Sequence, residues 1–108
     1  MSSRLNYEMA LAEQTAEALR GMQAGTLPVS TAIEVFQVAN RVALENSVRF
    51  PAAGPMNDAR AAVCAAFRDL IAAIVENRPR NVVVGTVAGN IEVWKRNLVA
   101  TLRSSDLR

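Results

Sequence analysis

The sequence contains no histidine, and it has only one cysteine, one tryptophan and one tyrosine. Without histidine, these 108 residues cannot form a Ser-His-Asp triad or a Cys-His pair, and they lack the commonest metal ligand. The single cysteine, Cys64, excludes a disulfide within the chain and a zinc site built from several cysteines. Because Cys64 falls inside an apolar run, we expect a buried, unreactive thiol rather than a nucleophile.

Phosphate-binding and calcium-binding loops are also missing. Gly85 and Gly89 are not followed by the Lys-Ser/Thr pair of a Walker A loop, and they do not form a G-x-G-x-x-G motif. No Asp-rich calcium loop occurs. The first helix carries Glu8, Glu13 and Glu17, which we interpret as a solvated acidic face, with a site for a hard cation as the alternative. The sequence therefore predicts no cofactor, no metal and no enzymatic activity, and it leaves only motif-free carboxylate, tyrosine or arginine chemistry open.

Long apolar runs are absent as well. The most apolar segment, residues 59–75, is interrupted by Arg60 and by Arg68 and Asp69. A membrane-spanning helix needs roughly 20 apolar residues, and a signal peptide needs an apolar block near the N-terminus that is not seen here. We therefore expect a cytoplasmic protein that does not bind membranes.

The sequence is rich in apolar residues and in residues that favour helices. Hydrophobic residues make up 51% of the chain, and many of them are alanine. Breaks rich in proline or glycine occur at residues 25–28, at residues 51–55 and at Pro79. The pattern predicts a single all-α domain over residues 1–108, folded as a compact bundle of three to four helices. Because an alanine-rich core buries little area per residue, we also expect a homodimer.

The first two helices are predicted from apolar spacing and from end signals. In residues 3–24 the apolar positions recur every three or four residues, and Gly25 suits the position just after a helix. The second helix is predicted to begin at Ser30 or Thr31, with Thr31 and Glu34 as a capping box, and to end before Pro51. The predicted buried positions are Leu5, Met9, Ala12, Ala16 and Leu19, followed by Val35, Phe36, Ala39, Val42 and Ala43.

The third helix is predicted to start at a cap formed by Asn57 or Asp58 and to end near Asn77. Its apolar residues extend nearly all round the helix, which is typical of a central or interfacial helix. The last segment, residues 81–103, is predicted to be a fourth helix with one apolar stripe. A loop or short strand before Asn90 is the alternative, because valines and two glycines cluster there. The predicted stripe consists of Val84, Val87, Ile91, Trp94, Leu98 and Leu102.

Candidate binding residues concentrate in this last segment. From Arg78 onward there are six basic and two acidic residues, a net charge of +4, whereas the rest of the chain carries −2. Glycines four residues apart offer a smooth face for another backbone, with a loop or turn as the alternative. The tryptophan is either core or an interface anchor, and its basic neighbours suit an acidic surface or phosphates. The predicted partner-binding residues are Gly85, Gly89, Trp94, Lys95, Arg96 and Arg103.

These features favour a non-enzymatic regulatory or adaptor protein that binds another protein through helical surfaces, for example an inhibitor that occludes its partner. The first alternative is a small DNA-binding protein that uses its basic C-terminal helix. The modest charge and the lack of a convincing helix-turn-helix pattern weigh against it. The second alternative is a structural subunit of a larger assembly.

Overall fold

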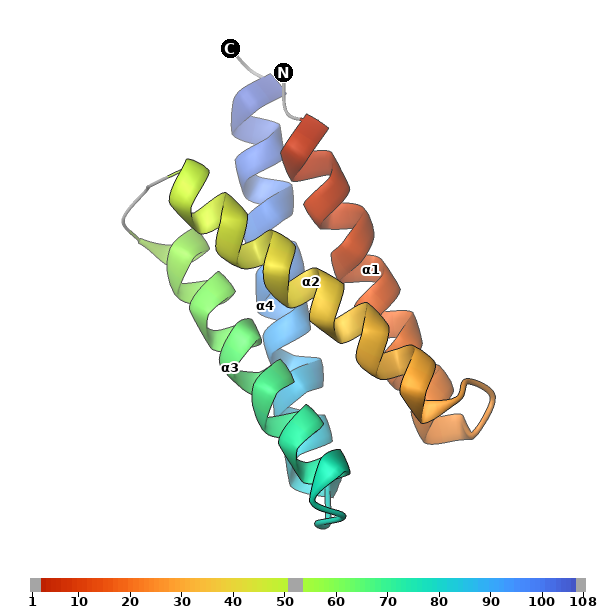
Figure 1. Ribbon diagram of the computed structural model, residues 1–108. Helices are drawn as coiled ribbons and strands as arrows, with labels where there is room; N and C mark the ends of the chain where they lie inside the picture. Colours follow the sequence, from red (N-terminus) through yellow and green to blue (C-terminus); the bar gives the residue numbers. More distant parts are fainter. Residues whose placement is uncertain (1–2, 51–53, 107–108) are drawn as a thin grey trace.

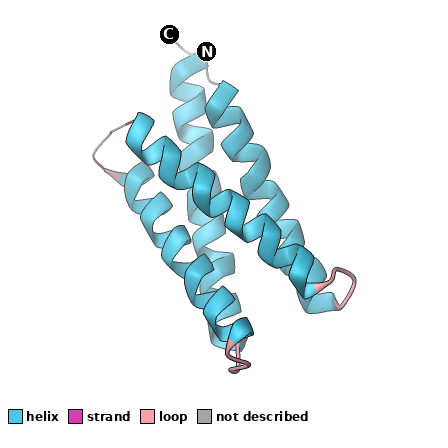
Figure 2. Ribbon diagram, viewed as in Figure 1, coloured by secondary structure: helices cyan, strands magenta, loops and turns pink. Residues whose placement is uncertain are grey.

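Four α-helices make up the described part of the chain. The computed structural model describes residues 3–50 and 54–106, and within them every regular element is a helix and none is a strand (Figure 2). The predicted all-α bundle is confirmed, and residues 81–89 are helical rather than a loop or a strand. The helices are α1 (Ser3–Ala24), α2 (Val29–Arg49), α3 (Pro55–Val75) and α4 (Asn81–Asp106).

The helices lie side by side in an elongated bundle, which is about as long as a single helix and about two helix diameters wide. α1 packs against α2 and α4, and α3 packs against the same two helices. Figure 1 shows α2 crossing obliquely in front, while the first turn of α1 and the last turn of α4 lie at the same end. The overall extents are 46 × 24 × 19 Å, which fits helices about 10 Å in diameter packed side by side.

The end of α1 is set by a glycine in the left-handed conformation. Gly25 has φ 75°, and the Thr26 N–H donates to the Gly21 carbonyl at 2.9 Å while the Gly25 N–H donates to the Met22 carbonyl at 3.3 Å. These two bonds make a Schellman motif, which satisfies carbonyls that the helix end would otherwise leave unpaired. The predicted role of Gly25 is confirmed.

The end of α3 repeats this arrangement with asparagine. Asn77 has φ 53°, the Arg78 N–H donates to the Ala73 carbonyl at 2.8 Å, and the Asn77 N–H donates to the Ile74 carbonyl at 3.1 Å. Asparagine tolerates the left-handed conformation better than most residues. The predicted end near Asn77 is therefore confirmed.

Both predicted N-terminal caps are wrong, because a proline precedes each of them. α2 begins at Val29 with Pro28 at the cap position and no side-chain capping bond, so Thr31 lies inside the first turn and the capping box is not formed. α3 begins at Pro55, ahead of the predicted Asn57 or Asp58 cap. Proline at or near the first helical position has the right φ and lacks only an N–H that would be unpaired there.

The apolar stripes meet in one core. In α4 the predicted stripe is buried from Val84 to Leu98, and Leu102 is partly buried. In α3 the apolar arc is less fully covered than predicted, because Ala62 and Val75 are exposed. The core residues contributed by α3 and α4 are Val63, Cys64, Ala66, Phe67 and Leu70 in α3 and Val84, Val87, Ile91, Trp94 and Leu98 in α4.

Gly21 and Gly85 are expected to respond in opposite ways to alanine. A Cβ atom at Gly21 would lie 2.9 Å from the Leu27 Cβ atom, whereas one at Gly85 would meet nothing within 4 Å. Gly21→Ala should therefore lower the free energy of unfolding by about 1–3 kcal/mol through overpacking. Gly85→Ala should raise it by about 0.5–1 kcal/mol because alanine loses less entropy in a helix. Urea denaturation at low protein concentration measures both, and equal effects would contradict this packing at the α1–α2 turn.

Candidate functional site

A buried polar cluster joins all four helices, and we call it the Glu8 cluster: Glu8 of α1, Asn46 of α2, Arg60 of α3 and Trp94 of α4. All four residues are at most 2% exposed. Glu8 Oε1 accepts from Asn46 Nδ2 at 2.7 Å and from Arg60 Nη2 at 2.9 Å. Glu8 Oε2 accepts from Arg60 Nε at 3.0 Å and from Trp94 Nε1 at 2.8 Å. Each carboxylate oxygen therefore has two donors, as a buried charge requires.

The prediction that Glu8 belongs to a solvated acidic face is wrong. Glu13 and Glu17 are exposed, but Glu8 points into the core between Leu5 and Ala12. The remaining donor side of the guanidinium is also used, since Arg60 Nη1 donates to Asn57 Oδ1 at 3.1 Å. A closed and satisfied cluster of this kind stabilises one arrangement of the helices, and it offers no free group to a substrate.

Cys64 is buried beside this cluster, as predicted. Its Sγ atom lies 3.7 Å from the carbonyl oxygen of Asn40, to which the thiol donates. Burial raises the pKa of the Cys64 thiol to about 11, against a smaller lowering effect of Arg68. The thiol is therefore protonated at neutral pH, and it does not have the low pKa that a nucleophilic cysteine needs.

Trp94 must be removed from the predicted partner-binding residues. Its side chain is 0% exposed, its Nε1 atom is bonded to Glu8, and its ring meets Phe67 edge-on at a centroid distance of 6.2 Å. A ring enclosed on all sides by its own chain cannot anchor a partner. The alternative prediction, that Trp94 belongs to the core, is confirmed.

The two glycines lie on the outer surface of α4. Gly85 and Gly89 are exposed, and no part of the described chain approaches the space that a side chain would fill. Val82 and Val93 continue the same face at spacings of three and four residues, and they are 83% and 42% exposed. We call these four residues the glycine face.

A groove runs between α1 and the C-terminal half of α4, and we call it the basic groove. It has a volume of about 360 Å³ and brings together the three predicted basic residues. Its α4 positions are three or four residues apart and form one ridge, about 16 Å long at 1.5 Å per residue. The lining residues are Met9 of α1 and Glu92, Lys95, Arg96, Val99, Ala100 and Arg103 of α4.

The basic groove carries three cations and one carboxylate. Lys95 Nζ lies 3.8 Å from Glu92 Oε1, an exposed ion pair of a kind that contributes little stability. Among the side chains that the structure describes, no acidic group pairs with Arg96 or Arg103. The groove is therefore electropositive, and Arg96 and Arg103 are exposed.

Sequence reasoning missed the apolar half of this groove. Met9 was assigned to the core stripe, but it is partly buried at the edge of that stripe, where α1 faces α4. Val99 is half-buried and Ala100 is exposed. Their spacing from Arg96 and Arg103 could have placed Val99 and Ala100 on the same ridge, whereas only the packing of α1 on α4 adds Met9.

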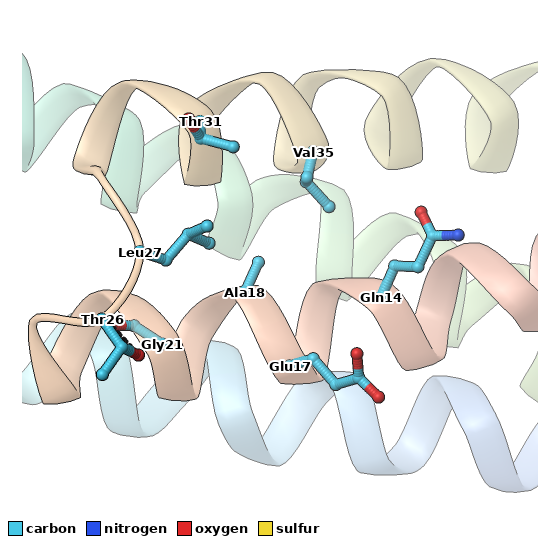
Figure 3. Close-up of a pocket in the computed structure, with 8 residues that line it drawn as sticks. All are labelled: Gln14, Glu17, Ala18, Gly21, Thr26, Leu27, Thr31 and Val35. Carbon is cyan, nitrogen blue, oxygen red and sulfur yellow. Dashed lines mark hydrogen bonds between the residues drawn. The ribbon is translucent and has the colours of Figure 1, made fainter.

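A second hollow lies between α1 and α2, beside the turn that joins them. It has a volume of about 370 Å³, and Figure 3 shows Leu27 and Ala18 facing the space between the two helices. Gln14 rises from α1 and Val35 descends from α2 toward this space, and Glu17 and Thr31 also line the hollow. With Glu17 as its one charged group, this hollow has no charge pattern that selects a ligand, so the basic groove is the stronger candidate.

Neither a cluster of metal ligands nor a membrane-spanning helix occurs in the described part of the chain. In residues 3–50 and 54–106, no three His, Cys, Asp or Glu side chains converge as metal ligands. None of the helices in these residues combines the length and the apolar content needed to cross a bilayer. Comparisons with models of protein families, with curated proteins and with solved structures found no match to the chain.

Proposed function

We propose that this chain is a non-enzymatic binding protein that regulates or tethers another protein through the surface of α4. The observation that supports the proposal is the basic groove, in which exposed arginines and an apolar floor occur together on one ridge. Protein interfaces combine apolar contacts with arginine in this way. The Glu8 cluster supports the same proposal, because it fixes α4 against the other three helices.

Binding to nucleic acid is the less favoured use of the same residues. A phosphate backbone is bound by cations and hydrogen-bond donors, and it does not need Met9 or Val99 beside them. Three cations with one carboxylate also make a small footprint for a duplex.

A photoreactive residue in place of Ala100, at the groove, tests the proposal in cells that make the protein. Ala61 of α3 is the matched control, since both alanines are exposed. We expect a discrete protein adduct from position 100 and none from position 61. The captured protein, once purified, should bind the wild-type chain and bind Arg96→Glu more weakly. Equal adducts from both positions, or none from position 100, would contradict the proposal.

We also propose that two copies of the chain associate through the glycine face. Val82 and Val93 expose apolar surface there, and Gly85 and Gly89 leave room for a second helix to approach closely. This face is centred in the N-terminal half of α4, and Val93, at its C-terminal end, lies three residues before Arg96 of the basic groove.

Gly89→Arg is expected to convert a dimer into monomers, because it places a long charged side chain where two backbones approach. Glu13→Arg, on the exposed side of α1, is the control and should leave the dimer intact. Analytical ultracentrifugation measures both. A wild-type chain that is monomeric at about 100 μM would refute the dimer, since stable interfaces of standard size bind much more tightly. A Gly89→Arg variant that remains dimeric would refute the glycine face.

A further inference from the structure

We propose that the basic groove binds an acidic, amphipathic α-helix of the partner protein. The inference rests on the proposed protein-binding function and names the chemistry of the partner. It is carried by the charge, the length and the apolar floor of the groove.

The charge of the groove is arranged along the helix axis. Arg96 and Arg103 are exposed, seven residues apart and therefore about 10.5 Å apart along α4 at 1.5 Å per residue. Two carboxylates seven residues apart on another helix have the same separation. A helix laid along α4 could therefore pair with both arginines at once.

The floor of the groove lies between these two charges. Val99 is three residues after Arg96, and Met9 of α1 closes the other side. A partner helix whose apolar residues fall midway between its two carboxylates would bury them against Val99 and Met9. Methionine adapts its shape to such contacts. The ridge is about 16 Å long, which corresponds to three turns of a docked helix.

A synthetic helical peptide is the probe. It carries two glutamates seven residues apart with two leucines midway between them, in an alanine- and glutamine-rich background. One comparison peptide has the glutamates moved to the opposite face, and another has the leucines replaced by alanine. Fluorescence anisotropy with the full-length chain should give a dissociation constant below about 100 μM for the first peptide, as for a small interface. Both comparison peptides should bind at least about tenfold more weakly, since each lacks one half of the recognition.

Charge reversal tests whether Arg96 and Arg103 pair with the two glutamates of the peptide. Arg96→Glu combined with Arg103→Glu should weaken binding of the first peptide at least about tenfold, because attraction becomes repulsion at two positions. A peptide with lysines in place of the two glutamates should then bind this variant better than it binds the wild type. Arg41→Glu combined with Arg68→Glu is the control. It makes the same change in net charge at exposed positions of α2 and α3, and it should leave binding unchanged.

Each possible result of these binding measurements either supports or overturns the proposed binding of an acidic helix. Tight binding of the first peptide with restoration by the charge swap supports it. Equal binding of the peptide with relocated glutamates, or of the peptide without leucines, would overturn it. So would a duplex DNA probe that binds at about 50 mM salt when the first peptide does not, because the groove would then be a phosphate site. If the peptide fails while cross-linking from position 100 captures a protein, the helix proposal is wrong and the protein-binding function stands. If both fail, both are wrong.

Discussion

Replacing Arg60 with methionine is expected to lower the free energy of unfolding by about 3–5 kcal/mol. The change leaves the carboxylate of Glu8 buried without its counter-charge, although Asn46 and Trp94 still donate to it. Domains of this size unfold with about 5–15 kcal/mol, so the variant should lose a large part of its stability. Urea denaturation followed by circular dichroism measures the loss.

A matched control for this prediction lies two turns further along α3. Arg68 is exposed, and Arg68→Met should change the free energy of unfolding by no more than about 0.5 kcal/mol. An Arg60→Met variant that is as stable as Arg68→Met would contradict the buried ion pair.

The combination of Glu8→Leu with Arg60→Met distinguishes the contribution of the Glu8–Arg60 ion pair to stability from that of the hydrogen bonds around it. Removing both charges together avoids an unpaired ion, so the double variant should lose less than the two single variants added together. It should still be less stable than the wild type. Trp94 would keep a buried donor without an acceptor, at about 1–3 kcal/mol, whereas Asn46 Nδ2 would keep only the Arg4 carbonyl oxygen, at 3.5 Å.

The helices were predictable from sequence, whereas the Glu8 cluster was not. Helix positions follow from apolar spacing, and α1 has the predicted bounds of residues 3–24. Polar residues within an apolar stripe were assigned to the surface by their chemical type. Their positions nevertheless carried information, since Glu8 follows Leu5 by three residues and Asn46 follows Ala43 by three, as buried residues do. What spacing cannot supply is the partner, because only the packing of four helices brings Arg60 to Glu8.

The residues of the basic groove were likewise predictable from sequence only in part. Lys95, Arg96 and Arg103 were predicted as binding residues from the local excess of positive charge, and all three line the groove. Trp94 is predicted with them because tryptophan is enriched in binding hot spots and this one is followed directly by Lys95 and Arg96. Successive residues of a helix point about 100° apart, so a side chain turned into the core is followed directly by side chains turned away from it. The bond from Trp94 to Glu8 therefore orients Lys95 and Arg96 toward the groove.

Phe67→Ala is expected to lower the free energy of unfolding by about 3–5 kcal/mol. Phe67 is 0% exposed, its ring stacks on Phe36 at a centroid distance of 5.4 Å, and it meets Trp94 edge-on. Removing the ring takes away both contacts and leaves a cavity that the surrounding helices fill only in part. Phe50, 39% exposed after the end of α2, is the control, and Phe50→Ala should cost less than about 1 kcal/mol.

Benzene distinguishes a cavity from a collapsed or misfolded core in the Phe67→Ala variant. An apolar cavity lined by large side chains stays dry and accepts benzene, and a ligand that binds only the folded state raises the melting temperature. We therefore expect benzene to raise the melting temperature of Phe67→Ala and to leave that of the wild type unchanged. A melting temperature that benzene does not raise, together with a loss below about 1 kcal/mol, would show that Phe67 does not pack between Phe36 and Trp94. The position of α4 relative to α2 and α3, and with it one wall of the basic groove, would then be wrong.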